Sequence, residues 1–369
     1  MRINGIGKLS AIVTALLLAA CGGDDGNGNA GVAAPVTSTA NIKEVVSFGD
    51  SLNDVGTYNP TTADTDKTND VFAGLPFTTK PGTTWASYLA LQYGFFLQPY
   101  ERVDFGVVGT TQGSGRVVVQ GGTSYAQGGA TVLNDAPNGG VTQTTVAPGV
   151  TVPVQLATAL SVKTQIDTYV AARTAFNAHQ LVLVDGGAND LINYLSAIAA
   201  GQAQPTQAAA TAIIGPAATG MVTQLGRLAA AGATNIVYNN VPDLGLTPAF
   251  KNTALQAFAT QITQGYNDAV KGGIAQAGLK VQLFDAYTML QTIVAAPAQF
   301  GLTNVDQPAC NSKDPSTGQL TSLLCSQSTL NAAGADATWV FADGVHPTNG
   351  MHKIWAGLVA AQIATAIPK

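Results

Sequence analysis

The sequence predicts an α/β fold in which helices cover both faces of a parallel sheet. Four apolar segments, 42–48, 181–184, 235–241 and 280–284, alternate with segments of helical spacing. These segments are continuously apolar, as in strands buried on both faces. With 46% hydrophobic and only 10% charged residues, the chain of 369 residues can form a large core. This composition excludes a wholly disordered chain, which combines low hydrophobicity with high net charge.

Residues 41–369 are expected to form one domain, whose elements follow in order. The first strand ends at Gly49-Asp50-Ser51, because these residues interrupt its β-branched run. Apolar residues recur at every third or fourth position in the segment 255–274, which places them on one face of a helix. Further helices are expected on the same grounds, and the full set is 83–93, 160–176, 208–231, 255–274 and an amphipathic 350–367.

Two loop insertions separate these elements, near 106–155 and near 297–338. The first is rich in Gly, Thr and Val, which predicts hairpins or a long decorated loop. Its length is typical of a lid or substrate loop, and beside a functional site it would influence the choice of substrate.

Residues 1–20 indicate a signal peptide rather than part of the fold. Arg2 and Lys8 give a basic start, and the apolar run 9–20 is shorter than a membrane-spanning helix needs. The run ends in Leu18-Ala19-Ala20-Cys21, which resembles the bacterial lipobox. No later segment has the length and apolarity of a transmembrane helix.

The resemblance to a lipobox implies that Cys21 is the lipidated first residue of the mature protein. Residues 21–40 then form a flexible tether, because they are rich in Gly, Asn, Ala and Thr and lack periodicity. With Gly22 after the cysteine, we expect export and anchoring to the bacterial outer membrane or cell surface. The alternative is an ordinary signal peptide with a chance cysteine, which would give a periplasmic or secreted protein.

Charge and cysteine content narrow the choice of partners and compartment. The 16 basic and 21 acidic residues give a net charge of −5 without a basic tract, which argues against nucleic acid as a partner. If Cys21 is lipidated, Cys310 and Cys325 remain as a pair in an oxidising compartment. We expect a disulfide between them; two buried free thiols are the alternative.

The chain has three histidines, and one of them lies in a suggestive turn. His346 follows Asp343 by three residues, close enough for the carboxylate to reach Nδ1 and leave Nε2 free as a general base. A structural Asp–His pair at the start of the last helix would give the same sequence. His179, just before a buried strand, and His352, in the first turn of the last helix, are weaker candidates.

The expected strand ends supply a nucleophile and hydrogen-bond donors that could work with such a base. Ser51 follows the first strand and is the candidate nucleophile, although an N-cap would look alike. Asn189 follows the second strand, and its side-chain amide can stabilise an oxyanion. Gly128-Gly129 permits a close backbone approach with a free N–H. Plain turn chemistry would explain each of these alone.

Taken together, these residues resemble the SGNH hydrolases, also called GDSL esterases and lipases. Four blocks of that family occur in family order, and a fifth recurring segment lies between the last two. The similarity covers roughly residues 43–365. The blocks are Phe48-Gly49-Asp50-Ser51-Leu52-Asn53-Asp54-Val55-Gly56, Tyr125-Ala126-Gln127-Gly128-Gly129-Ala130, Gly187-Ala188-Asn189-Asp190 and Phe341-Ala342-Asp343-Gly344-Val345-His346-Pro347-Thr348, with 240–248 as the fifth segment.

The resemblance implies a flavodoxin-like α/β/α sandwich that hydrolyses carboxylic esters through an acyl-enzyme. Ser51 would attack the carbonyl carbon, His346 would take its proton, and Asp343 would orient His346. The oxyanion hole would combine the N–H groups of Ser51 and Gly129 with the side chain of Asn189. Gly128 is the alternative backbone donor.

The expected substrates are short- to medium-chain acyl esters or lipids, without a cofactor or metal. A metal site at Asp343, His346 and His352 is disfavoured because three histidines in the chain supply few ligands. The absence of a Gly-x-Ser-x-Gly elbow argues against an α/β-hydrolase. The alternatives are a carbohydrate O-deacetylase and a surface lipoprotein that binds a ligand without turning it over.

Overall fold

The computed structural model describes residues 41–59, 74–104, 116–137, 141–147, 150–155, 158–173, 175–313 and 320–366. It divides into residues 1–34 and 35–369, so every described residue lies in the second unit. The expected signal peptide 1–20, Cys21 and the whole tether 21–40 are outside the described residues.

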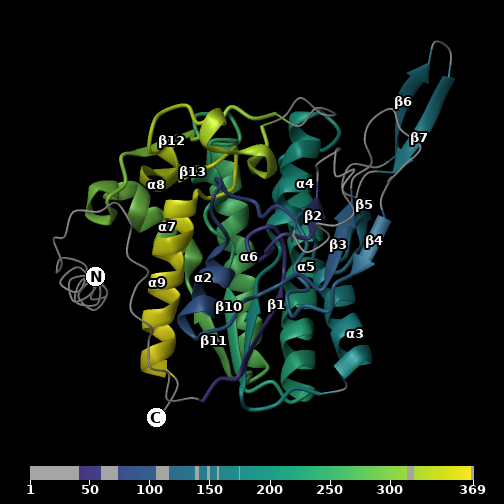
Figure 1. The fold of residues 1–369 in the computed structure, drawn as a ribbon, viewed down its shortest axis with the longest axis vertical. Helices are drawn as coiled ribbons and strands as arrows, with labels where there is room; N and C mark the ends of the chain where they lie inside the picture. Colours follow the sequence, from purple (N-terminus) through teal and green to yellow (C-terminus); the bar gives the residue numbers. More distant parts are fainter. Residues whose placement is uncertain are drawn as a thin grey trace. The chain divides into compact units, whose positions relative to one another are not determined.

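A parallel sheet forms the centre of this unit (Figure 1). Its strands are β1 (Glu44–Phe48), β9 (Gln180–Val184), β10 (Asn235–Asn239) and β11 (Val281–Phe284), in that spatial order. Beside β1, the N–H of Tyr125 donates to Ser47 O (2.7 Å), so a short segment adds to the edge of the sheet. The resulting order matches the flavodoxin-like 2-1-3-4-5 pattern, as predicted.

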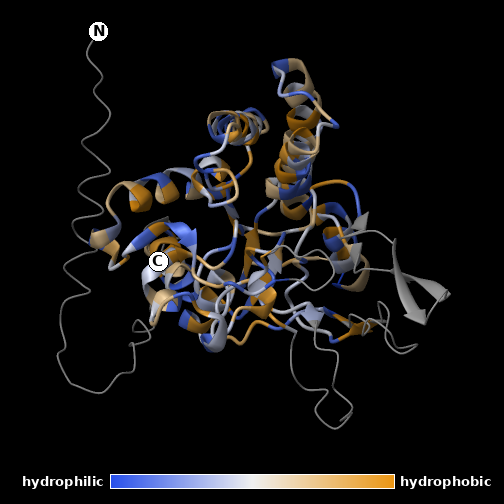
Figure 2. Cartoon of the chain, turned by 90° about the horizontal axis from the view of Figure 1, so that it is seen from above, coloured by the Kyte–Doolittle hydropathy of each residue, from blue (hydrophilic) through white to orange (hydrophobic). Residues whose placement is uncertain are grey.

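Alternate strand residues face opposite layers, which explains the continuously apolar strands. Val46, Val182 and Ile236 belong to a core cluster with α3 (Val162–Arg173), α4 (Ala188–Ala199), α5 (Gln207–Ala230) and α6 (Gln256–Gln276). Val45, Leu181 and Val237 belong to a second cluster with α2 (Trp85–Gln92), α7 (Ala286–Ala295) and α9 (Asn349–Ala366). Seen from above, helices with orange and blue sides flank the apolar strands (Figure 2).

The remaining elements are short and lie outside the central sheet. They are β2 (Tyr58–Asn59), β3 (Glu101–Asp104), β4 (Arg116–Val119), β5 (Ala136–Pro137), β6 (Val141–Ala147), β7 (Val150–Gln155), β8 (Thr158–Ala159), β12 (Asn304–Pro308), β13 (Trp339–Phe341) and α8 (Ala335–Thr338), with 3-10 turns η2 (Leu244–Leu246), η3 (Pro297–Phe300), η4 (Ser322–Leu324) and η5 (Gln327–Thr329).

The helix expected over 160–176 is shorter, and three helices are additional: α4, α7 and the four-residue α8. α3 ends at Arg173. α4 begins directly after Gly187, whose φ of +103° reverses the chain after β9. α7 begins at an N-cap, Asp285, whose side chain accepts the N–H of Thr288. Neither α4 nor α7 was among the helices expected from the sequence.

The expectation that no later segment has the apolarity of a membrane helix was wrong for α5. Its 24 residues are long and apolar enough by length and composition. However, Met221, Leu225 and Leu228 are fully buried in the core cluster formed with α3, α4 and α6. The apolar face of α5 therefore packs within the folded unit.

The insertion expected over 106–155 is also not one continuous decoration. Residues 120–130 run beside β1 and place Gly129 at the cavity described below. Strands β6 and β7 pair as an antiparallel hairpin, in agreement with the expected hairpins. Residues 105–115, 138–140 and 148–149 are outside the described residues.

Candidate active site

Ser51 lies two residues after a tight turn at the carboxyl end of β1. Gly49 in this turn has φ +145°, and an added Cβ would lie 1.7 Å from Asp185 Oδ1, so only glycine fits. The buried side chain of Gln165, from α3, holds both backbone groups of Gly49: Oε1 accepts its N–H and Nε2 donates to its O, each at 2.8 Å. The turn is thereby fixed from two directions.

Ser51, His346 and Asp343 form one continuous chain of hydrogen bonds. His346 Nε2 lies 2.9 Å from Ser51 Oγ, and His346 Nδ1 lies 2.7 Å from Asp343 Oδ2. Asp343 and His346 come from the turn between β13 and α9, some 290 residues after Ser51 in sequence. The fold therefore brings together the three residues that the sequence analysis singled out.

Asp343 is buried among hydrogen-bond donors. Its Oδ1 accepts the N–H groups of Val345 (2.9 Å) and His346 (2.8 Å), and its Oδ2 also accepts the N–H of Ser322 (2.6 Å). Burial would raise the pKa of Asp343, but the charge of His346 and these bonds outweigh it and lower the pKa to about 2. Asp343 is therefore a carboxylate at neutral pH.

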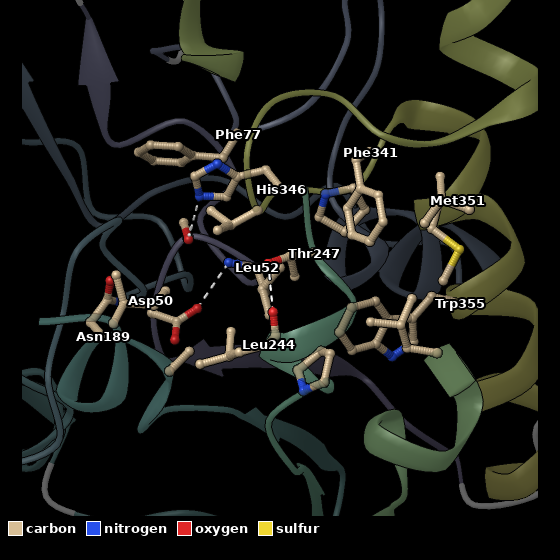
Figure 3. Close-up of a pocket in the computed structure, with 18 of the residues that line it drawn as sticks. Asp50, Leu52, Phe77, Asn189, Leu244, Thr247, Phe341, His346, Met351 and Trp355 are labelled. Atoms are coloured by element: carbon tan, nitrogen blue, oxygen red, sulfur yellow. Dashed lines mark hydrogen bonds between the residues drawn. The ribbon is translucent and has the colours of Figure 1, made fainter. Parts of the chain in front are cut away.

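His346 is held in place by its neighbours and favoured in its charged form. Burial lowers the pKa of His346, but the adjacent Asp343 carboxylate outweighs it, and the net shift is upward. The ring of Phe77 lies against the imidazole, with ring centres 4.9 Å apart (Figure 3). This contact covers one face of the imidazole, and the hydrogen bonds to Ser51 and Asp343 fix the orientation of its two nitrogens.

The two candidate oxyanion groups also lie at this site. Asn189 Nδ2 donates to Ala130 O (3.0 Å), which leaves its second amide hydrogen for a ligand. The N–H of Gly128 donates to Asp54 Oδ2 (2.9 Å), so it is already engaged. Gly129, with φ +85°, is the member of the pair that lines the cavity.

A cavity of about 200 Å³ begins at Ser51 and is mostly apolar. Figure 3 shows Asn189 and Asp50 at one end, Leu52, Leu244 and Thr247 in the middle, and Phe341, Met351 and Trp355 at the other end. Among the described residues, those lining it come from the strand ends, from α4, α7 and α9, and from the loops that carry Phe77, Gly129 and His346.

Two buried carboxyl residues, Asp50 and Asp185, lie side by side next to the turn that carries Ser51. The N–H of Asp50 donates to Asp185 Oδ1 (2.8 Å), and neither Asp50 Oδ2 nor Asp185 Oδ2 has a hydrogen-bond partner among the described residues. Burial raises the pKa of Asp50 to about 6. Burial, together with the nearby Asp50 carboxylate, raises the pKa of Asp185 well above its ordinary value.

The other residues singled out from the sequence lie away from Ser51 Oγ. His179 is exposed in the turn before β9, and His352 is buried in α9, where its Nδ1 accepts the N–H of Trp85 (3.1 Å). Cys310 and Cys325 form a disulfide. Its loop contains Ser322, which donates to Asp343, so the disulfide lies next to the site.

Several site residues were missed by sequence reasoning. Asp54 stood within a quoted block but without a role, and its spacing three residues after Ser51 was the available signal. Ser322 acts through its backbone N–H, a group that every residue except proline has, so its residue type gives no signal. Phe77 and Gln165 reach the site from distant segments, and nothing in their local sequence marks them.

The chain is similar in sequence to a known family and to several curated proteins. The family described as GDSL-like Lipase/Acylhydrolase matches residues 45–359. "GDSL esterase/lipase APG" of Arabidopsis thaliana is 26% identical over 154 residues, 36% of this chain and 40% of that protein. "Esterase EstA" of Pseudomonas aeruginosa is 33% identical over 120 residues, 31% of this chain and 18% of that protein. The chain thus spans less than half the length of these curated relatives.

Among solved structures, a carbohydrate acetylesterase from Sinorhizobium meliloti aligns with a TM-score of 0.39 and 14% identity, covering 88% of this chain and 100% of that one. An aryl esterase of M. smegmatis aligns with a TM-score of 0.38 and 16% identity, and the alignment again covers 88% of this chain and 100% of that one. The family match spans nearly all of the described domain and includes each of the four sequence blocks. The chain belongs to the GDSL-like lipase/acylhydrolase family.

Proposed function

We propose that this protein hydrolyses carboxylic esters through an acyl-enzyme on Ser51. The supporting observation is the chain from Ser51 Oγ to His346 Nε2 (2.9 Å) and from His346 Nδ1 to Asp343 (2.7 Å) at the opening of an apolar cavity. These distances are within the range in which a base can take the proton of its nucleophile.

In the first half of the reaction, Ser51 Oγ bonds to the carbonyl carbon while its proton passes to His346 Nε2. The carbonyl oxygen becomes an oxyanion that accepts from the N–H groups of Ser51 and Gly129 and from Asn189 Nδ2. His346 then returns the proton to the departing alcohol oxygen as the carbon–oxygen bond breaks. Water repeats the sequence on the acyl-enzyme, releasing the carboxylic acid and restoring Ser51.

The electrostatics of the site support these roles. Asp343 remains ionised and accepts from Nδ1, so the imidazolium that forms during each step is stabilised where it arises. Removing one oxyanion donor typically costs about 10²–10³-fold in kcat, and we expect a loss of this order when Asn189 is replaced by Ala.

Ser51→Ala tests this proposal, with Ser196→Ala, an exposed serine of α4, as the matched control. We expect Ser51→Ala to lose hydrolysis of p-nitrophenyl esters by at least about 10³-fold while its melting temperature stays within a few degrees. A serine-directed phosphonate should add mass to the native protein and to the control, but not to Ser51→Ala. Full activity in Ser51→Ala would refute the mechanism, and faster turnover of acetylated sugars would favour a carbohydrate deacetylase.

We also propose that the chain is exported and lipid-anchored through Cys21. The support is the segment Leu18-Ala19-Ala20-Cys21, followed by a Gly- and Asn-rich stretch. Metabolic labelling with radioactive palmitate should mark the native protein and not Cys21→Ser. Membrane fractionation should follow the label. Equal membrane association of both proteins would contradict the anchor.

A further inference from the structure

The cavity next to Ser51 continues into the core between the sheet and one helix layer. Its inner end is formed by Val340 and Phe341 of β13 and by Met351 and Trp355 of α9, which are at most 2% exposed. Met289 and Leu290 of α7 complete the wall. In Figure 3, Met351 and Trp355 lie at the opposite end of the cavity from Asn189.

The chemistry of this inner end suits a hydrocarbon. The indole N–H of Trp355, the polar group at this end, already donates to Asn239 Oδ1 (3.1 Å). A sugar hydroxyl placed there would lose its water without gaining a partner, which is costly. An alkyl chain loses nothing and leaves water.

The arrangement around Ser51 decides which part of an ester enters. In the tetrahedral intermediate, the oxyanion points towards Asn189 and Gly129, and the departing oxygen must lie near His346 Nε2. The third substituent of the same carbon is the acyl chain. The side left for it leads past Leu52 towards Met351 and Trp355 (Figure 3).

We propose that this cavity holds the acyl chain of the substrate and that Met351 and Trp355 form the floor that limits its length. This rests on the proposed ester hydrolysis at Ser51. An apolar cavity of about 150 Å³ binds benzene, with six carbons. By proportion, about 200 Å³ holds roughly eight carbons, so the preferred substrates are esters of medium-chain acids.

This assignment differs from the expectation that an insertion influences the choice of substrate. Of residues 106–155, Gly129 lines the cavity in the described part, and the described residues of the disulfide-closed loop do not line it. Selection by chain length is therefore assigned to α7, α9 and β13, elements of the fold itself.

Two ester series test the proposal on the mature protein. One keeps p-nitrophenol as the alcohol and varies the acyl chain from two to sixteen carbons; the other keeps acetate and varies the alcohol. For the native protein, kcat/KM should rise about fourfold per added acyl methylene. The rise should stop near eight carbons, and the alcohol series should lack such a limit.

A larger side chain at position 351 should shorten the cavity, and a smaller one should lengthen it. Met351→Phe should lower the octanoate-to-acetate ratio of kcat/KM at least tenfold, and Met351→Ala should move the preferred acyl chain longer by one to three carbons. Met221→Ala is the matched control, because Met221 is equally buried but packs in the other core cluster, away from the cavity. It should leave the ratio unchanged, and thermal melts would show its loss of stability separately.

The outcomes separate this proposal from the proposed function. Acetate turnover with an unchanged acyl profile in both Met351 variants would overturn the floor assignment alone. A change confined to the alcohol series would place the alcohol in the cavity. Absence of turnover on every ester by the native protein would overturn the ester hydrolysis itself, and the acyl assignment with it.

Discussion

At the scale of single residues, Asp343 controls the protonation of His346. Asp343→Asn removes the negative charge that raises the pKa of His346, so the pH at which kcat/KM is half-maximal should move to lower pH. The rate itself should fall by about 10³–10⁴-fold, because the amide cannot stabilise the imidazolium. A pH–rate profile measures both. Asp268→Asn, an exposed carboxylate of α6, should leave the profile unchanged.

Asp54 positions the oxyanion donor without touching the substrate. Its Oδ1 accepts the N–H groups of Gly56 (2.9 Å) and Thr57 (2.7 Å), and its Oδ2 accepts that of Gly128 (2.9 Å). In Asp54→Asn, an amide that keeps the Oδ1 bonds presents N–H to the N–H of Gly128. We expect kcat to fall by about 10²-fold with KM nearly unchanged. If KM rises by as large a factor as kcat falls, the substitution has distorted the whole active site rather than the oxyanion donor alone.

The Asp50–Asp185 pair makes stability depend on pH. A carboxyl group with a raised pKa binds its proton more tightly in the folded state, so the free energy of unfolding falls as pH rises from about 4 to about 6 and beyond. Asp185→Asn keeps the acceptor for Asp50 N–H and removes one charge. Its melting temperature should exceed that of the native protein by about 2 °C or more at pH 8. The difference should vanish at pH 4; equal melting temperatures at both pH values would contradict the coupling.

At the scale of elements, the disulfide-closed loop supports the active site. Ser322 donates its N–H to Asp343, while Lys80 Nζ donates to Ser322 O (3.1 Å) and Leu323 O (2.6 Å). The Cys310–Cys325 bridge closes this loop across a separation of 15 residues. The disulfide therefore restrains a donor to the carboxylate that orients His346.

The double variant Cys310→Ser/Cys325→Ser should lose both stability and activity. A cross-link over about 15 residues contributes about 3 kcal/mol by restricting the unfolded chain. We also expect kcat to fall several-fold as Ser322 becomes less well held. Melting curves and kcat with and without reductant measure the two effects. Reductant should lower the melting temperature and kcat of the native protein and leave those of the variant unchanged. If neither the substitutions nor reductant changes kcat, the loop does not support catalysis.

The elements also show what could be predicted from sequence. Strands β1 and β9 were predicted almost to the residue, because both faces of each strand are apolar. The helix α7 was missed, although Asp285 caps it and Ala286, Met289, Leu290 and Ile293 follow at helical spacing. Its pattern spans only ten residues, which is too short to separate from a loop without tertiary packing.

At the scale of the whole domain, the parallel strand order gathers the site. Gly49-Asp50-Ser51 and Asp185-Gly186-Gly187 follow neighbouring strands, so their side chains meet at one edge of the sheet. The sequence blocks could therefore place Ser51 and Asn189 near each other. The cavity could not be predicted, because its lining combines α4, α7, β13 and α9, and only packing fixes their separation.

The same strands contribute to both core clusters, so the two helix layers should unfold together. Val45 and Val46, adjacent in β1, face opposite clusters. In urea, near-ultraviolet circular dichroism and esterase activity should therefore decline in one shared transition. Two separated transitions would show that one layer is stable without the other.

His346 and the cavity floor lie on one short stretch of chain. Only two residues separate His346 from α9, and Met351 and Trp355 follow within its first two turns. Substitutions in α9 therefore change the position of His346 and the size of the cavity at the same time. Met289 of α7 contacts the same cavity from a segment without catalytic residues. Divergence of substrate range among descendants of this sequence, or in a laboratory library, should accordingly begin at Met289, where a new preference can arise before the chemistry is disturbed.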